Sequence, residues 1–458
     1  MDFGWTDEQL ARRAAARDFA ARALSDPSLE ARDREGTFDR DQWTRCAEFG
    51  ILGLSVPAEF GGADIDLPTS MLVMEGLGEG CPDNGLPFAL NAQLWTVQRP
   101  LVRFGSAEQK RRFLPGMCGG TLIGAHALTE PETGSDAFNM SMRAERSGDT
   151  YVLNGTKCLV SLAPLADVVL VFASTAPSRG KWGISAFVVE GTTPGLRAAP
   201  MQHKMGLRTV PIGALHFEDC VVPASACLRP EGAGVSIANH SLEVERCCIL
   251  ASQLGAMERQ LQRTVAYAGS RQQFGQAIGK FQSVSNRVAD MKLRLETARL
   301  LLYKVAWMVE RGQPAMLEAA LLKLYLSEAF VESGLDAIRI YGGIGYLSES
   351  GVERDLRDTV GGVLYAGTSD IQRNIIARLL GLCLACCISS HTPSTAPPCA
   401  PPTGTPSGTW GRRSPTRRSP SAPTASPGCC GRKACSAVIG SGSMRARDWP
   451  PPSRCTGS

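Results

Sequence analysis

Apolar or small residues recur at every third or fourth position along two long stretches in the second half of the chain. The first stretch carries Val284, Val288, Met291, Leu295, Ala298, Leu302, Val305 and Val309. The second carries Ala319, Leu322, Leu326, Phe330, Ser333, Ala337 and Ile340. Because such spacing puts side chains on one face of a helix, it predicts two long helices that pack against each other. With partner helices before residue 268 and after residue 369, residues 229–384 are predicted to form a four-helix bundle.

A different pattern fills residues 119–228, where short runs of β-branched and aromatic residues alternate with turn-forming residues. The runs cover residues 150–153, 168–172, 184–189 and 214–217. Several short strands separated by turns are typical of a small antiparallel barrel or sandwich. We therefore predict a middle β domain over residues 119–228.

Residues 1–118 carry the start signals of helices. Thr6, Asp39 and Ser106 each stand three positions before a glutamine, and such pairs satisfy the free N–H groups at a helix N-terminus. Glycine-rich segments at 61–62 and 76–85 are predicted to separate these helices. The predicted fold is therefore mainly α with a central β domain.

The composition changes abruptly after Leu384. Thirteen of the 29 prolines lie between residues 393 and 452, mixed with Ser, Thr, Gly and Arg and almost without large apolar residues. Such a segment cannot bury enough apolar area to offset its ordering entropy, so we predict that residues 385–458 are a disordered Pro/Ser/Arg-rich tail. Its origin as a natural extension, a linker or a shifted reading frame stays open, as does binding of this basic segment to an acidic partner.

Charge and apolar run length exclude several classes of protein. The tail holds nine of the 48 Lys and Arg residues and one of the 44 Asp and Glu residues, so the rest of the chain is mildly acidic. We therefore expect no nucleic-acid partner for the body of the protein. No run of 18 apolar residues occurs and the first 30 residues are rich in charge. This predicts a cytoplasmic protein with no membrane segment and no secretory signal.

The spacing of cysteine and histidine argues against a metal site. Eight of the 16 cysteines lie before residue 383, singly apart from Cys247 and Cys248, and the five histidines form no metal-spaced pair. We expect reduced, mostly buried thiols and no metal. Cys383 and Cys386 have the spacing of a thiol-redox pair, but they stand where the helical pattern ends, so a redox role is a minor alternative. The chain also lacks a G-x-G-x-x-G loop, which argues against a doubly wound nicotinamide dehydrogenase.

One segment combines hydroxyl side chains with small residues and so leaves backbone N–H groups open to a ligand. It reads Gly124-Ala-His-Ala-Leu-Thr-Glu-Pro-Glu-Thr-Gly-Ser-Asp136. A helix N-cap or an ordinary turn uses the same residue types. The order of the residues, however, resembles the Leu-Thr-Glu-Pro-x-x-Gly-Ser-Asp signature of the acyl-CoA dehydrogenase family, flavoenzymes that oxidise the Cα–Cβ bond of an acyl thioester. Further blocks resemble the family in the same order: 154–157, 271–275, 281–282, 289–291 and 367–373.

The resemblance covers about residues 1–384 and implies a fold and a cofactor. The implied fold has an N-terminal helical domain, a small antiparallel β-barrel and a C-terminal four-helix bundle, and the implied cofactor is FAD. It assigns FAD contacts to Leu128, Thr129, Ser135, Ser161, Arg271, Phe274, Gln282, Gly343, Thr368 and Asp370. The chain departs from the family at Leu159, where many members have tryptophan beside the flavin ring, and at Ser161, where they have threonine. Arg339 replaces the usual glutamine and puts one pyrophosphate or adenosine contact in doubt.

Two of these residues imply more than one subunit. Arg271 and Phe274 match the block that reaches the FAD of a neighbouring subunit, so the resemblance implies a homotetramer or a homodimer. A surface ion pair and a core aromatic are the alternative interpretation of the same two residues.

The general base is the most informative departure from the family. Most members carry it as the glutamate of Tyr-Glu-Gly-Thr, whereas this chain reads Tyr365-Ala-Gly-Thr368. A minority that includes isovaleryl-CoA dehydrogenase carries it immediately before an arginine on a helix of the C-terminal domain, and Glu245 occupies that place. The resemblance therefore implies Glu245 as the base, with Ser135 and Arg246 as substrate contacts. A solvated helix that merely carries Glu245 is the alternative.

Within the family, the chain most resembles the L-prolyl-carrier-protein dehydrogenases of pyrrole-forming secondary metabolism. The matching text includes residues 103–106, 281–287, 290–296 and 333–338. The implied substrate is a thioester on the phosphopantetheine arm of an acyl or peptidyl carrier protein, with prolyl oxidised to pyrrolyl. A short-chain or branched-chain acyl-CoA dehydrogenase is one alternative. A non-catalytic subunit that binds flavin or a partner is another.

Overall fold

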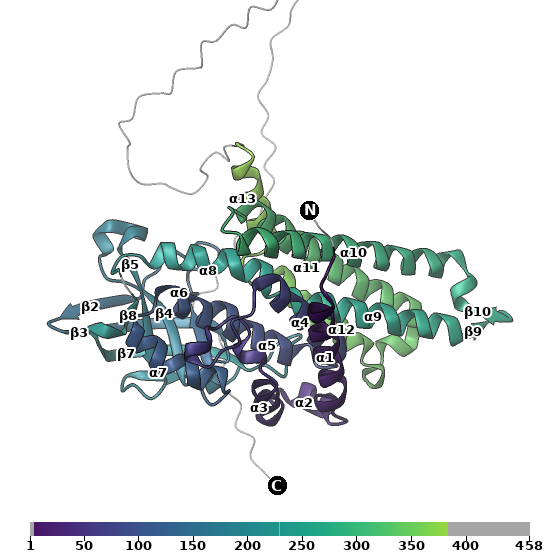
Figure 1. Cartoon of the computed structure of the whole chain (residues 1–458), viewed down its shortest axis with the longest axis horizontal. Coiled ribbons are helices and arrows are strands. Elements are labelled where there is room, and N and C mark those ends of the chain that lie inside the picture. Colours follow the sequence, from purple (N-terminus) through teal and green to yellow (C-terminus); the bar gives the residue numbers. More distant parts are fainter. Residues whose placement is uncertain (1–3, 229, 383–458) are drawn as a thin grey trace, which may run out of the picture. The chain divides into compact units, whose positions relative to one another are not determined.

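Helices, a β-sheet and again helices follow one another along the chain (Figure 1). The computed structural model describes residues 4–228 and 230–382 of the 458-residue chain. The predicted tail at 385–458 and the pair Cys383 and Cys386 lie outside the described residues. This order of elements confirms the predicted architecture, mainly α with a central β domain.

The N-terminal part is helical, and its start signals act as predicted. Its α-helices are α1 (Asp7–Ala23), α2 (Leu29–Glu35), α3 (Arg40–Glu48), α4 (Leu67–Gly80), α5 (Gly85–Ala92), α6 (Arg99–Phe104) and α7 (Ala107–Cys118), and a π-helical segment, η3 (Gln93–Gln98), joins α5 to α6. Thr6 and Ser106 form reciprocal capping boxes with the glutamines three positions on. Asp39 accepts a hydrogen bond from the backbone N–H of Gln42.

The glycines of α4 correct one prediction. The helix break predicted at 76–85 is wrong at its start, because α4 runs through Gly76 and Gly78 and ends at Gly80. A Cβ at Gly78 would lie 1.9 Å from the carbonyl oxygen of Ser252, and one at Gly76 would lie 2.3 Å from that of Arg13. The glycines therefore let α1 and α9 (Ala251–Ser270) pack directly against the backbone of α4.

The middle part is a sheet of eight strands in which antiparallel pairs predominate. They are β1 (Gly124–Ala127), β2 (Arg143–Ser147), β3 (Thr150–Ser161), β4 (Val168–Ser174), β5 (Ile184–Glu190), β6 (Leu196–Ala198), β7 (Ile212–Pro223) and β8 (Cys227–Leu228), ordered β6-β7-β3-β2-β4-β5-β8 with β1 parallel to β4. All four predicted strands are confirmed. Alternate residues of β4 belong to two apolar cores, with Leu170 and Phe172 facing helices and Val169 and Val171 on the opposite face.

The C-terminal part is again helical and holds both predicted stripes. Its elements are α8 (Gly234–Cys248), α9, the hairpin β9 (Gln272–Gln273) and β10 (Gln276–Ala277), α10 (Gln282–Glu310), α11 (Met316–Tyr341), α12 (Val352–Val360) and α13 (Ser369–Leu379). The stripe on α11 is entirely buried. On α10 the stripe is buried from Met291 to Val305, and its end residues pack partly buried against the same core. Because α9, α10 and α11 contact one another, their apolar faces form a single core.

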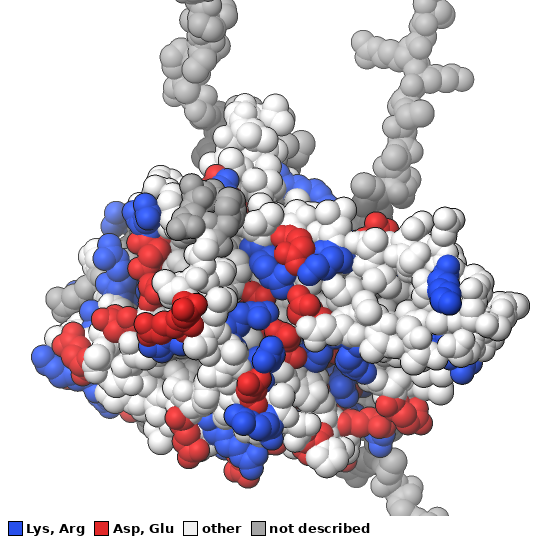
Figure 2. Space-filling view, turned by 45° about the vertical axis from the view of Figure 1, so that its right-hand side comes forward, with Lys and Arg blue, Asp and Glu red and all other residues white. Residues whose placement is uncertain are grey.

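The surface of the described chain mixes charges of both signs. On the face seen in Figure 2, Lys and Arg side chains alternate with Asp and Glu side chains rather than gathering by sign. Charged side chains of the described chain also form ion pairs, such as Lys292–Glu296 and Arg373–Glu328. Within residues 4–228 and 230–382, no helix is long and apolar enough to cross a membrane.

Candidate active site

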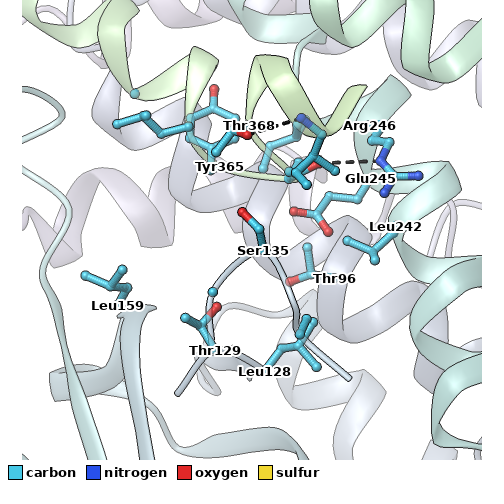
Figure 3. A pocket seen from close by; sticks show the side chains of 18 of the residues that line it. Thr96, Leu128, Thr129, Ser135, Leu159, Leu242, Glu245, Arg246, Tyr365 and Thr368 are labelled. Carbon is cyan, nitrogen blue, oxygen red and sulfur yellow. Dashed lines mark hydrogen bonds between the residues drawn. The ribbon is translucent and has the colours of Figure 1, made fainter. Parts of the chain in front are cut away.

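A cavity of about 1150 Å³ opens between the sheet and the helices. Its wall comes from six parts of the chain: α5 with η3, the segment that starts in β1, the end of β3, the segment 204–212, helix α8, and the stretch from the end of α12 through α13 to residue 382 (Figure 3). Of the residues predicted to form the site, it contains Leu128, Thr129, Ser135, Ser161, Glu245, Arg246 and Thr368. The fold therefore brings together side chains that are up to 240 residues apart in the sequence.

A buried ion pair fixes the segment that follows β1. The Lys157 ammonium, fully buried on β3, donates to Glu130 Oε1 at 2.9 Å and to the Leu128 carbonyl oxygen at 3.0 Å. Glu130 also accepts from the backbone and hydroxyl of Ser141. Burial alone would raise the pKa of Glu130, but Lys157 and Ser141 lower it overall, so this carboxylate stays charged. The two matching blocks at 128–136 and 154–157 are thus joined in space, which their sequence separation does not reveal.

Three hydroxyl groups on this side of the cavity have no hydrogen-bond partner among residues 4–228 and 230–382. Thr129, Ser135 and Ser161 line the cavity, and in the part of the chain that the structure describes their hydroxyls make no hydrogen bond. Leu159 lines it as well, with a positive φ of 54° and 62% of its surface exposed. Polar groups open to a cavity and an apolar side chain held beside them fit a flat ligand with polar edges.

Helix α8 presents a buried carboxylate to the cavity. Glu245 is 8% exposed, and Figure 3 shows its carboxylate pointing toward the space around Ser135 and Thr96. Burial raises the pKa of Glu245 to about 7, against the opposing positive charges of Arg246 and Lys323. A carboxyl group with a pKa near neutrality can take up and release a proton at physiological pH, as a general base must.

The segment between α12 and α13 places Ala366 in the same wall. The Ala366 carbonyl oxygen accepts from Arg246 Nε at 3.4 Å and from Gln372 Nε2 at 3.1 Å, and its φ of 54° is in the left-handed region. Thr368 caps α13 by accepting from the backbone N–H of Ile371. Position 366 therefore lines the cavity, where most family members would carry a glutamate. Because this chain has alanine there, the nearby carboxylate that lines the cavity is Glu245 of α8.

Two groups near Glu245 were given no role by the sequence analysis: Tyr365, which lines the cavity, and Lys323, which does not. Tyr365 receives a hydrogen bond from Gln253 Nε2, and burial together with the nearby Glu245 charge raises the pKa of its phenol. Lys323 on α11 is fully buried, and its ammonium has no hydrogen-bond partner among the described residues. Burial and the Arg246 charge lower the pKa of Lys323 to about 8. The available signal was a lysine set among the apolar residues of the α11 stripe.

The remaining predicted cofactor residues do not line this cavity. Arg271, Phe274, Gln282, Gly343 and Asp370 are all exposed, and Phe274 is 93% exposed at the turn of the β9–β10 hairpin. In Figure 1 this hairpin lies at the end of the helical part opposite to the sheet. Asp370 forms an ion pair with Arg373 at 3.3 Å. Arg339, the departure noted in the sequence, pairs with Asp336 at 3.0 Å.

Among residues 4–228 and 230–382, no three His, Cys, Asp or Glu side chains are arranged to hold a metal ion. The eight cysteines in this range are free thiols, and all but Cys158 are buried.

Family models for acyl-CoA dehydrogenases match three successive parts of the chain. The N-terminal domain model matches residues 6–121, the middle domain model 125–220 and the C-terminal domain model 232–381. The chain belongs to the acyl-CoA dehydrogenase family, which confirms the resemblance found in the sequence.

Several individual proteins of this family are similar to the chain over most of its length. An L-prolyl-[peptidyl-carrier protein] dehydrogenase of Pseudomonas fluorescens is 42% identical over 383 residues, covering 83% of this chain and all of the relative. The human short-chain specific acyl-CoA dehydrogenase of mitochondria is 39% identical over 79% of this chain and 87% of its own length. Among solved structures, the prolyl acyl carrier protein oxidase AnaB superposes with a TM-score of 0.82 at 47% identity, over 83% of this chain and 100% of AnaB. PigA with FAD and proline gives 0.81 at 40% identity with the same coverage.

Proposed function

We propose that this chain is an FAD-dependent dehydrogenase that oxidises an L-prolyl thioester on a peptidyl carrier protein to the pyrrolyl thioester. The observation that carries the proposal is Glu245, a buried carboxylate in a cavity whose alternative base position is alanine. Relatives at 42% and 41% identity that bear the name L-prolyl-[peptidyl-carrier protein] dehydrogenase support the substrate.

The residues present fit FAD. The cavity of about 1150 Å³ exceeds the roughly 300–1000 Å³ of most small-molecule sites, so it has room for a flavin beside a thioester. The unpaired hydroxyls of Thr129, Ser135 and Ser161 supply hydrogen bonds at one wall, and Leu128 and Thr368 complete the contact. FAD, when bound, accepts a hydride from the carbon β to the thioester.

Glu245 removes the proton from the carbon α to the thioester carbonyl. Conjugation with the thioester acidifies that proton only modestly, so a positioned base with a pKa near neutrality is required. Arg246, next on α8, donates to the backbone carbonyl oxygen of Ala366 and so links α8 to the segment between α12 and α13. One removal of a proton and a hydride gives a dihydropyrrolyl thioester. A pyrrolyl group has four hydrogens fewer than a prolyl group, so a second oxidation follows, and an external electron acceptor must first take two electrons from the reduced FAD.

The exposed predicted residues support an assembly of more than one chain. Arg271, Phe274, Gln282 and Gly343 lie away from this chain's own cavity, and a phenylalanine that is 93% exposed is costly for a monomer to leave in water. We propose that they contact the FAD of a neighbouring copy in a homodimer or homotetramer. Asp370, beside Thr368 at the start of α13, is proposed to contact the cofactor from its own chain.

Anaerobic mixing with three thioesters tests the proposal. The purified protein should be yellow, and prolyl-loaded carrier protein should bleach its visible flavin absorbance far faster than prolyl-CoA, because the carrier adds binding remote from the reacting atoms. Equal rates with both, or bleaching by butyryl-CoA alone, would favour a short-chain acyl-CoA dehydrogenase. Flavin that no thioester bleaches would instead indicate a non-catalytic subunit.

A further inference from the structure

Two polar side chains in the cavity wall, Thr96 and His126, each have an atom that could form a further hydrogen bond and has no partner for it among the described residues. Thr96 of η3 is 5% exposed, and its hydroxyl donates its proton to the Ala92 carbonyl oxygen at 2.6 Å. The lone pairs of the Thr96 hydroxyl oxygen are therefore free to accept a hydrogen bond. His126 of β1 has a buried Nε2 that finds no partner within the described residues.

The two side chains come from elements that touch each other. The backbone N–H of Gly124 donates to Gln93 Oε1 at 2.7 Å, and a Cβ at Gly124 would lie 2.9 Å from Val97 Cγ1. Gly124 and His126 share one face of β1 because side chains alternate along a strand, so His126 also points to the side of η3. Its ring contacts Phe172 edge-on, with the ring centroids 5.4 Å apart.

His126 is uncharged at neutral pH. Burial and the nearby Lys157 charge lower its pKa to about 4. A neutral imidazole has one nitrogen that accepts a hydrogen bond, and it does not repel a cationic amine. With its proton on Nδ1, His126 has an acceptor at Nε2, so in this tautomer Thr96 and His126 offer two acceptors in one cavity.

The surrounding wall is mostly apolar. Phe88, Ala92 and Leu242 line the cavity next to Thr96. A plain acyl chain would match these side chains, yet it would leave both acceptors buried without a donor, which is costly. An aminoacyl thioester differs by a nitrogen bound to the α-carbon, the atom from which Glu245 takes its proton. Figure 3 shows Thr96 just beneath the Glu245 carboxylate, so a substrate atom that Glu245 can reach would also lie near Thr96.

We propose that Thr96 and His126 together form an acceptor site for the amine N–H of the substrate and so select aminoacyl over plain acyl thioesters. The inference rests on the proposed function and deepens it, because it assigns the recognition of the ring nitrogen to residues of this chain. Both are specificity-determining residues, and neither takes part in proton removal.

A pair of isosteric thioesters on the same carrier protein tests the proposal. One carries L-prolyl, and the other carries cyclopentanecarbonyl, in which carbon replaces the ring nitrogen. The wild-type protein should reduce its flavin faster with prolyl. Thr96→Val, which keeps the shape of the side chain, should cut kcat/KM for prolyl by roughly tenfold and leave cyclopentanecarbonyl unchanged or faster. His126→Phe should act in the same direction, and His126→Asn, which keeps an acceptor, should restore much of the preference.

A matched variant controls for the loss of a buried hydroxyl. Thr264→Val removes a threonine of α9 that is 1% exposed and whose hydroxyl donates to a carbonyl one turn back, as that of Thr96 does, but it lies outside the cavity. It should leave the ratio of the two rates unchanged. The visible absorbance of each purified variant reports its FAD content separately from its rates.

Several outcomes would overturn the inference. A prolyl preference that survives both Thr96→Val and His126→Phe would do so, as would an equal fall for both thioesters. If His126→Phe lost FAD while Thr96→Val kept the preference for prolyl over cyclopentanecarbonyl, His126 would be assigned to the cofactor instead. A wild-type protein that oxidises neither thioester would refute the proposed function itself, which is a different result.

Discussion

The cavity wall and the β9–β10 hairpin carry residues that the same family resemblance marks as cofactor contacts, yet they are built in opposite ways. The wall is assembled within one chain, with Lys157 and Glu130 buried behind it and Glu245 only 8% exposed. The hairpin presents Arg271 and Phe274 to the outside. We therefore expect one copy of the chain to contain the proposed chemistry, and we expect the hairpin to complete the cofactor site of a second copy.

Glu245→Gln should have the largest effect, because it tests the proposed general base in the cavity wall. Glutamine keeps the shape and hydrogen bonding of the side chain but cannot take a proton, so flavin reduction should slow by about 10²- to 10⁴-fold. FAD should be retained, and stopped-flow absorbance measures the rate. Glu108→Gln, at an exposed position of α7, is the control. Glu243 is unsuitable because its carboxylate accepts from the backbone N–H of Ala315. A wild-type rate in Glu245→Gln would place the base elsewhere.

Arg271→Ala tests the hairpin. We expect FAD to dissociate roughly 10- to 100-fold more readily, since a charged contact from a neighbouring chain is lost. Circular dichroism should show the helix content unchanged, because Arg271 is exposed. Flavin released on dilution, followed by fluorescence, measures the effect. The exposed Arg111 of α7 provides a matched substitution that should do nothing. Unaltered FAD retention in Arg271→Ala would refute the contact between chains.

The pH dependence of the rate of flavin reduction tests how burial and the Lys323 charge set the pKa of Glu245. Glu245 acts as a base only when ionised, so with its pKa at about 7 the rate should rise through neutrality and fall below it, rather than persisting to pH 5 as for an ordinary carboxyl group. The Lys323 charge lowers the pKa of Glu245, so Lys323→Met should move the acidic limb to higher pH. At pH 7 the rate should fall by less than about tenfold. An acidic limb that does not move would show that Lys323 has no electrostatic effect on the base.

The smallest effect is expected at the end of the chain. Removing residues 385–458 should change neither the thermal unfolding temperature nor the FAD content, because this segment lacks the apolar residues to join a core. The family match also ends at residue 381. Differential scanning calorimetry of the shortened chain beside the full chain gives the comparison, and insoluble shortened protein would contradict the prediction.

Periodic patterns predicted most of the fold, and matched motifs predicted half of the site. The stripes on α10 and α11 were visible because neighbouring turns of one helix repeat the same environment. Glu245 was predicted as the base because Ala366 cannot take a proton and because Glu245 stands immediately before an arginine, and its role stays a prediction. Thr96, His126 and Lys323 were missed, since a single polar residue in an apolar segment looks the same whether it faces a cavity, a partner or water. Only contacts between distant segments, such as Lys157 with Glu130, distinguish these cases.

The glycines of α4 have a consequence for motion. Gly76 and Gly78 bring this helix against the backbones of α1 and α9, and Gly255 of α9 meets the carbonyl oxygen of Glu75 in return, where a Cβ would lie 1.9 Å away. Helices in such close contact have no intervening side chains to rearrange, so they cannot slide or roll past one another without separating. We therefore expect α1, α4 and α9 to move together as one unit. We expect any motion that admits a substrate to occur in segments outside these three helices.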